Sequence, residues 1–255
     1  MKHCIWCHRT SEFTSFNNKA HIVPQGLGGD LICDNVCDDC NRFFGQKTKK
    51  GPAIEEAIKE TFHVSRLRFL AVQNEIGRNK ALVKTDSLFF KIDLAKHKVS
   101  LKTAYKLKPH FQDRLCRLLK QGLYKMFLEE NERINGDSNA SKYDFIREFA
   151  RYDLGEYPVI YFHRKHGIIL QELGYAKSPK LYLKPEERNK YLICDHGMHE
   201  FEFFGHVFGI PVSRNWNLTY DLYRKETKKA KKDLFTGFKI IENFSDIDLT
   251  LKILN

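Results

Sequence analysis

The sequence predicts an α+β protein built from two parts, a compact N-terminal module of about 50 residues and a larger α+β domain after it. Two observations support this organisation. Five of the seven cysteines and three closely spaced glycines lie in the first 40 residues, where helical periodicity is weak. The remaining chain combines segments of helical spacing with short alternating segments, which is typical of α+β folds. We expect a module at residues 1–50, a connecting helix at 51–76 and an α+β domain at 77–255.

Helices are expected where apolar residues recur every three to four positions. Ile54, Ile58 and Phe62 follow this spacing after Pro52, which suits a first helical turn. Ser141 is a suitable N-cap for a later helix, and a glycine follows the expected end of that helix. We expect helices over residues 52–74, 110–130 and 141–153.

Strands are expected where apolar and polar residues alternate between turn residues. Phe201 and Phe203 show this alternation and indicate one buried face. The basic segment 224–232 is expected to be a solvated helix or loop, with contact to a nucleic acid as an equal alternative. We expect strands within residues 79–103 and over residues 159–162, 168–173, 181–183, 191–194 and 200–208.

The charge balance favours a polyanionic partner. Lysine and arginine number 43 against 32 acidic residues, a formal net charge of +11. Such an excess attracts nucleic acids through the release of counterions. No apolar run is long enough to span a bilayer, and no apolar stretch follows the positive charge at the N-terminus. We therefore expect a cytoplasmic protein with no membrane partner.

Two Cys-x-x-Cys pairs, Cys4 with Cys7 and Cys37 with Cys40, indicate a metal site. A tight turn at each pair lets two sulfurs reach one ion, and two pairs complete a tetrahedral zinc site. Because protein fills all four positions, this zinc is expected to be structural. It would replace hydrophobic core that so short a module can scarcely supply. Cys33 has an unrelated spacing and is expected to be a small core residue.

A second set of polar residues lies between and just after these pairs. The segment contains His21 within Ala-His-Ile-Val-Pro, then a Gly-Gly pair, Asn35, and Asn41 directly after the last cysteine. In this order, the motif resembles the HNH endonucleases, also called the ββα-metal group, over about residues 4–45. The resemblance implies a hairpin and a short helix, at residues 20–23, at 31–33 and from about 36.

The resemblance also implies a role for each polar residue. The neutral imidazole of His21 would accept a proton from the water that attacks phosphorus. Asn41 would offer a carbonyl oxygen to a catalytic divalent ion, Mg²⁺ or Mn²⁺. Asn35 would brace the loop and orient the histidine. The products would carry 5′-phosphate and 3′-hydroxyl ends.

One position departs from the commoner pattern of this family. The residue before the histidine often contributes a metal ligand, whereas here it is Ala20. Three alternatives follow: Asn41 suffices as a single ligand, the site is inactive, or a nearby carboxylate replaces the missing ligand. The candidates for that replacement are Asp30, Asp34, Asp38 and Asp39.

The sequence thus predicts a divalent-metal-dependent endonuclease that hydrolyses DNA phosphodiester bonds in restriction or phage defence, with RNA as an alternative substrate. The domain at 77–255 would serve substrate recognition or dimerisation. Because one HNH site cuts one strand, double-strand cleavage would need a homodimer. The basic residues expected to contact phosphates are Arg42, Lys47, Lys49 and Lys50.

Two other classes of function stay open at this point. The first is a non-catalytic zinc-ribbon protein that binds nucleic acid through a decayed HNH site. The second is a structural interaction protein, which would show no salt-dependent affinity for nucleic acid.

Overall fold

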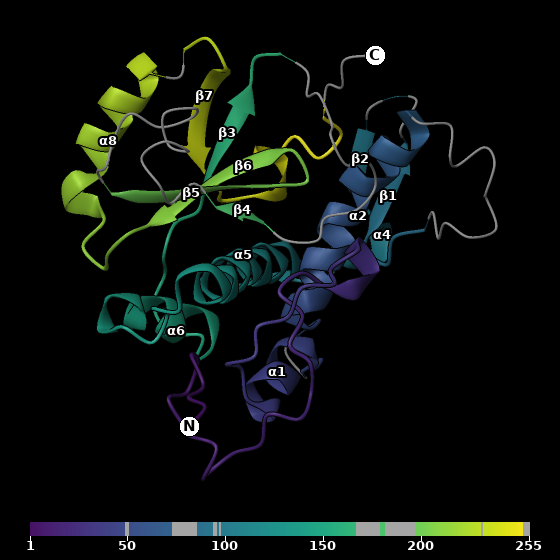
Figure 1. The fold of residues 1–255 in the computed structure, drawn as a ribbon. Helices are drawn as coiled ribbons and strands as arrows, with labels where there is room; N and C mark the ends of the chain where they lie inside the picture. Colours follow the sequence, from purple (N-terminus) through teal and green to yellow (C-terminus); the bar gives the residue numbers. More distant parts are fainter. Residues whose placement is uncertain are drawn as a thin grey trace.

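The computed structural model describes residues 1–48, 51–72, 86–93, 96, 98–166, 179–181, 197–230 and 232–251. Helices and strands are mixed along the chain, as the sequence predicts. The sheet of the C-terminal half lies above the long helix α5 (Phe111–Asn135), and the N-terminal module lies below it, beside α2 (Ile54–Val72) (Figure 1). No helix in these ranges is both long and apolar enough to cross a membrane.

The main sheet has five strands in the order β4-β5-β6-β3-β7, and all neighbours pair antiparallel. Successive residues face opposite layers. Tyr161 and Phe208 join the core on the α5 side, whereas Ile160 and Phe162 pack with α8 (Asn217–Ala230) on the other side. The strands are β3 (Ile160–Arg164), β4 (Lys180–Leu181), β5 (Met198–Phe203), β6 (His206–Pro211) and β7 (Phe235–Ile240).

Residues 200–208 form parts of two strands, where the sequence predicts one. The chain reverses at Phe204 and Gly205, whose φ angles are 48° and 73°. Two consecutive residues with positive φ make a tight hairpin turn. The turn escapes sequence analysis because Phe204 is itself buried, so the apolar character of the strand continues through the reversal.

Helices α2 and α5 pack closely and form the centre of the molecule. A Cβ atom at Gly122 of α5 would lie 2.3 Å from Cγ1 of Ile58, so only glycine allows this approach. The helix expected at 141–153 is shorter: η2 (Ser141–Tyr143) precedes α6 (Asp144–Ala150). Tyr143 is the N-cap of α6, so the expected cap at Ser141 is wrong; that residue opens the preceding 3-10 turn.

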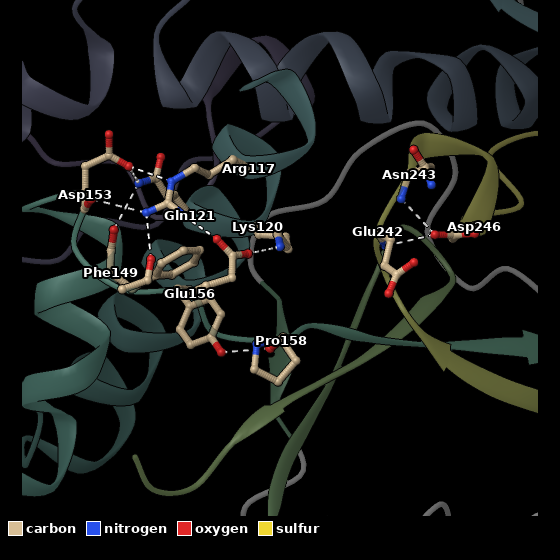
Figure 2. Close-up of polar contacts among 12 residues, drawn as sticks. Arg117, Lys120, Gln121, Phe149, Asp153, Glu156, Pro158, Glu242, Asn243 and Asp246 are labelled. Carbon is tan, nitrogen blue, oxygen red and sulfur yellow. Dashed lines mark hydrogen bonds and ion pairs between the residues drawn. The ribbon is translucent and has the colours of Figure 1, made fainter. Parts of the chain in front are cut away.

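The chain after α6 is fastened to α5 by polar contacts (Figure 2). Oδ1 of Asp153 accepts hydrogen bonds from Nε of Arg117 at 2.7 Å and from Nε2 of Gln121 at 2.8 Å. One turn further along α5, the buried hydroxyl of Tyr124 donates to the carbonyl oxygen of Pro158 at 2.8 Å. These contacts fix the position of α5 relative to the sheet.

Smaller elements complete the described chain. A hairpin of β1 (Phe90–Asp93) and β2 (Lys98–Leu101) accounts for part of the strand region expected at 79–103. The strands expected at 168–173 and 191–194, and the last two residues of 181–183, lie outside the described residues. The other short elements are η1 (Gln25–Leu27), α1 (Asp38–Gly45), α4 (Thr103–Lys106) and η3 (Phe244–Asp246).

Candidate active site and metal centre

The four paired cysteines come together at the start of α1. Cys4 and Cys7 lie in a tight N-terminal turn, in which the amide of His8 donates to the carbonyl of Cys4 at 2.9 Å. Cys37 is the N-cap residue of α1, and Cys40 lies in its first turn. The ligand atoms of the four cysteines all lie within 4.8 Å of one another.

This arrangement fits a tetrahedral zinc ion. Zinc–sulfur bonds of about 2.3 Å require sulfurs about 3.8 Å apart, and the Sγ atoms of Cys7 and Cys37 lie 3.7 Å apart. Two arginines lie against the cluster: Nε of Arg9 is 3.4 Å from Sγ of Cys7, and Nε of Arg151 is 3.3 Å from Sγ of Cys40. Their positive charges would offset the negative charge of four thiolates around one Zn²⁺. The cluster is therefore suited to a structural zinc.

The proton affinities of the thiols reflect how closely they are packed. A hydrogen bond from Cys40 lowers the pKa of Cys4 to about 4, although burial works in the opposite direction. The same hydrogen bond raises the pKa of Cys40. Burial raises the pKa of Cys37 as well, so Cys4 is the sulfur that most readily becomes a thiolate, which is the form that binds zinc. Cys33 stays apart as a buried core residue, as predicted, and burial raises the pKa of its thiol.

The segment between the cysteine pairs forms the short antiparallel pairing that the resemblance implies. His21 bridges Ile32, and the amide of Cys33 donates to the carbonyl of Ala20 at 2.9 Å. The Gly-Gly pair has a steric cause. Gly28 adopts a φ of 97° at the end of η1, and a Cβ at Gly29 would lie 1.9 Å from the carbonyl oxygen of Val23.

His21 and Asn41 face the same cavity of about 500 Å³. The pocket lies where η1, α1 and the start of α2 meet. Nδ2 of Asn41 donates to the carbonyl of Lys19 at 3.2 Å, which leaves its Oδ1 for a ligand in the pocket. The lining residues are Asn18, Lys19, His21, Pro24, Gln25, Asp38, Asn41, Arg42, Gly45 and Glu55.

His21 is held in place through its main chain. Nδ1 is buried and has no hydrogen-bond partner among the described residues. The carbonyl oxygen of His21 accepts a hydrogen bond of 2.8 Å from Nζ of Lys125, a fully buried residue of α5.

Asn35 lies outside the residues that line the pocket. Its Nδ2 donates to Oε1 of Glu132 on α5 at 2.6 Å, and its carbonyl oxygen accepts from the amide of Ile5 at 2.9 Å. Asn35 thus ties the turn before α1 to both the N-terminal knuckle and the long helix.

The carboxylates considered as substitutes for a ligand at position 20 differ in location. The methyl group of Ala20 is buried in the core. Of the four candidates, only Asp38 lines the pocket. Its Oδ1 accepts a hydrogen bond from the amide of Asn18 at 2.8 Å, and hydrogen bonds from Ser15 and Asn18 lower its pKa. Asp39 pairs instead with Arg9 at 2.8 Å.

Glu55 is a pocket carboxylate that sequence analysis missed. It lies in the first turn of α2, which the sequence identifies only as a connecting helix. Its Oε1 is 3.3 Å from Nζ of Lys125, and the same ammonium donates to Glu129 at 2.8 Å. No local signal marks Glu55, because its place in the pocket depends on how α2 packs.

Burial and charge oppose each other in this group of residues. Burial raises the pKa of Glu129 to about 7, although the ammonium of Lys125 works to lower it. Burial also works to lower the pKa of Lys125, but the charges of Glu129 and Glu55 outweigh it and raise that pKa. Nε1 of Trp6 donates to Glu129 at 3.1 Å, so the group reaches the zinc knuckle.

The basic residues expected to contact phosphates differ in how they are paired. Arg42 lines the pocket. Its Nη1 lies 3.9 Å from Oδ1 of Asp39, which makes a loose ion pair. Lys47 forms a closer ion pair with Glu56, at 2.8 Å. Lys49 and Lys50 lie outside the described residues.

The comparisons with known proteins bear on the N-terminal segment. Residues 4–52 match the family model of HNH endonucleases. Neither the curated proteins nor the solved structures give a match to this chain. The matched segment contains both cysteine pairs, His21, Asn35 and Asn41 and ends shortly before Glu55.

Proposed function

We propose that the chain is a divalent-metal-dependent endonuclease that hydrolyses DNA phosphodiester bonds. The observation that carries this proposal is that His21 and Asn41 line one cavity beside the four-cysteine cluster. The HNH match over residues 4–52 supports a nuclease, and the net charge of +11 suits a polyanionic substrate.

In this proposal the imidazole of His21 accepts a proton from a water molecule. The oxygen of that water forms a bond to phosphorus while the bond between phosphorus and the 3′ oxygen breaks, which leaves a 5′-phosphate and, after protonation, a 3′-hydroxyl. Asn41 would hold a hydrated Mg²⁺ or Mn²⁺ through Oδ1. A bound ion of this kind supplies positive charge to the phosphate and the leaving oxygen. Zinc at the four cysteines would fix the positions of His21 and Asn41 relative to each other.

Two further parts of the proposal concern the substrate and its context. DNA is preferred over RNA, and a role in restriction or phage defence is inferred from the HNH resemblance alone. Because a single site cuts one strand, cleavage of both strands would require a homodimer. The mass of the protein in solution, measured by light scattering with and without a duplex, tests that requirement.

Plasmid cleavage by zinc-loaded protein tests the central proposal. We expect nicked or linear plasmid with Mg²⁺ or Mn²⁺ and none with a chelator of these ions. His21→Ala should abolish cleavage while zinc content and DNA affinity stay unchanged. His3→Ala is the matched control, because His3 is an exposed histidine of the same module that does not line the pocket. Equal cleavage by His21→Ala and wild-type protein would refute the assignment of the base.

A non-catalytic nucleic-acid-binding protein is the second candidate. The observation in its favour is the buried methyl group at Ala20, where related sequences often carry a metal ligand. Such a protein would bind DNA in a salt-dependent manner, yet it would leave plasmid intact with every divalent ion tested.

A further inference from the structure

We propose that Glu55 is a ligand of the divalent ion in the pocket and takes the place of the ligand that Ala20 cannot provide. This inference rests on the proposed function and deepens it. Glu55 lies on α2 and outside the segment that matches the HNH family model. The site would therefore be completed by a residue of the helix that packs on the module.

The orientation of the Glu55 carboxylate supports this role. Oε1 lies 3.3 Å from Nζ of Lys125. Oε2 is the oxygen nearer to α1: a Cβ atom at Gly45 of that helix would be 3.5 Å from it. Gly45 follows Asn41 by four positions in α1, so both residues lie on the same face of that helix. Oε2 thus lies over the helix face that presents the Asn41 carboxamide to the pocket.

The groups around Glu55 also identify it as the carboxylate that can reach a cation. Lys125 is the buried ammonium between two carboxylates, Glu55 and Glu129. With both carboxylates ionised this group carries one excess negative charge, and with Glu129 protonated it is neutral; Lys19 and Arg42 add positive charge to the same pocket. The side chain of Glu55 is 26% exposed, whereas Glu129 is fully buried, so Glu55 is the member that can reach a hydrated ion.

Asp38 is the other pocket carboxylate, and it is already engaged. Its Oδ1 holds the amide of Asn18, and its hydrogen bonds fasten the loop before the hairpin. The simpler explanation of Glu55 is that its carboxylate only neutralises the charge of Lys125, and the contact of Oε1 alone would suffice for that role. The two accounts differ in whether loss of the Glu55 charge weakens ion binding.

Calorimetric titration of the zinc-loaded full-length protein with Mn²⁺ distinguishes these two accounts. Even outer-sphere partners of metal ligands typically contribute about 10–100-fold to affinity. We therefore expect Glu55→Gln to weaken Mn²⁺ binding at least about tenfold. Asn41→Ala should weaken it similarly. Glu56→Gln is the matched control: Glu56 is adjacent on α2 but pairs with Lys47 and does not line the pocket, so affinity should stay within about twofold.

One outcome would overturn the role of Glu55 and leave the proposed function intact. In that outcome Glu55→Gln binds Mn²⁺ within about twofold of wild type, whereas Asn41→Ala binds it more weakly. Failure of the wild-type protein to bind Mn²⁺ or cleave plasmid would overturn both. If Glu55→Gln loses zinc or unfolds, the ¹³C carboxyl shifts of the wild-type protein show whether Glu55 binds the ion. Mg²⁺ should shift the Glu55 carboxyl signal and leave that of Glu56 in place; the absence of a Glu55 shift would refute the proposal.

Discussion

The ammonium of Lys125 lies 2.8 Å from the main-chain carbonyl oxygen of His21. This contact joins the middle of α5 to the segment that carries the candidate base. Trp6 of the zinc knuckle and Phe44 of α1 belong to the same hydrophobic core as the α2 and α5 residues. The segment that matches the HNH family model therefore packs on the remaining chain, and the geometry of its pocket depends on that packing.

Replacing Lys125 by methionine should destabilise the protein by up to about 3–5 kcal/mol, because Glu129 would be buried either as an unpaired charge or as an acid that must take up a proton. The loss is measured as the free energy of unfolding of the zinc-loaded protein in urea. The double variant Lys125→Met/Glu129→Gln should recover much of this stability, because it removes the unpaired charge and keeps an acceptor for Trp6. It should not recover cleavage, because the His21 carbonyl still lacks its donor. A double variant no more stable than the single one would contradict this account.

Removal of zinc should unfold the N-terminal module. Trp6 is fully buried next to Cys4 and Cys7, so its fluorescence should shift to longer wavelength when a strong chelator strips the metal. Cys37→Ser should reduce zinc from about one ion per chain to near zero and cause the same shift. Cys116→Ala, a buried cysteine of α5, is the control and should keep its zinc. Retention of zinc by Cys37→Ser would refute the four-cysteine site.

Asn35 and Asn41 should separate stability from ion binding. Asn35→Ala removes a hydrogen bond to the carboxylate of Glu132, and such bonds to charged groups contribute about 1.5–3 kcal/mol. We expect a loss of that size in urea unfolding, with Mn²⁺ affinity within about twofold of wild type. Asn41→Ala should show the opposite pattern. If Asn35→Ala weakens Mn²⁺ binding as much as Asn41→Ala does, Asn35 contributes directly to the pocket.

The sequence predicts the parts of the site that are set by short spacing. Each Cys-x-x-Cys pair forms within one local turn, so the cysteine cluster follows from the two pairs. The motif around His21 predicts the short antiparallel pairing. The closeness of the Val23 carbonyl oxygen explains why position 29 is a glycine. In each case the physical cause lies within a few residues of the motif.

Contacts between distant segments were not predictable in this way. Glu55, Lys125 and Glu132 reach the module only because α2 and α5 pack against it, and no local pattern distinguishes them from other helical charges. The turn at Phe204 was missed for a related reason. Its side chain is buried by tertiary packing, so an apolar residue occupies a position where a polar turn residue is expected.

Arg42 should contribute more to DNA affinity than Lys47 does. Arg42 lines the pocket and its ion pair is loose, whereas Lys47 must give up a close pair with Glu56 to contact a phosphate. Arg42→Ala should weaken binding to a duplex and reduce the dependence of log affinity on log salt by about one unit. Lys47→Ala should change both less. Fluorescence anisotropy at several salt concentrations measures both, and equal effects of the two variants would contradict the ranking.

His206 should make the fold sensitive to acid. The hydroxyl of Ser65 donates to the carbonyl of Leu249 at 2.9 Å, so Nε2 of His206 must donate to that hydroxyl, 2.7 Å away. Nδ1 then accepts from the hydroxyl of Tyr161 at 3.1 Å. This arrangement satisfies a neutral imidazole, and a second ring proton would disrupt it. Burial and the nearby charge of Arg164 lower the pKa of His206 to about 3.

In the unfolded chain a histidine titrates near about pH 6.5. Between that pH and about 3 the unfolded state therefore binds more protons at position 206 than the folded state does. Stability should rise with pH across this window and fall as the solution is acidified, by up to about 1.4 kcal/mol per pH unit from this residue. His206→Gln should lower stability at pH 7 but flatten the slope between pH 5 and 6.5. Glu129, whose pKa is raised to about 7, contributes a slope of opposite sign in both proteins, so the difference between wild type and variant isolates His206. Parallel wild-type and variant slopes in urea unfolding would show that His206 does not control the acid response.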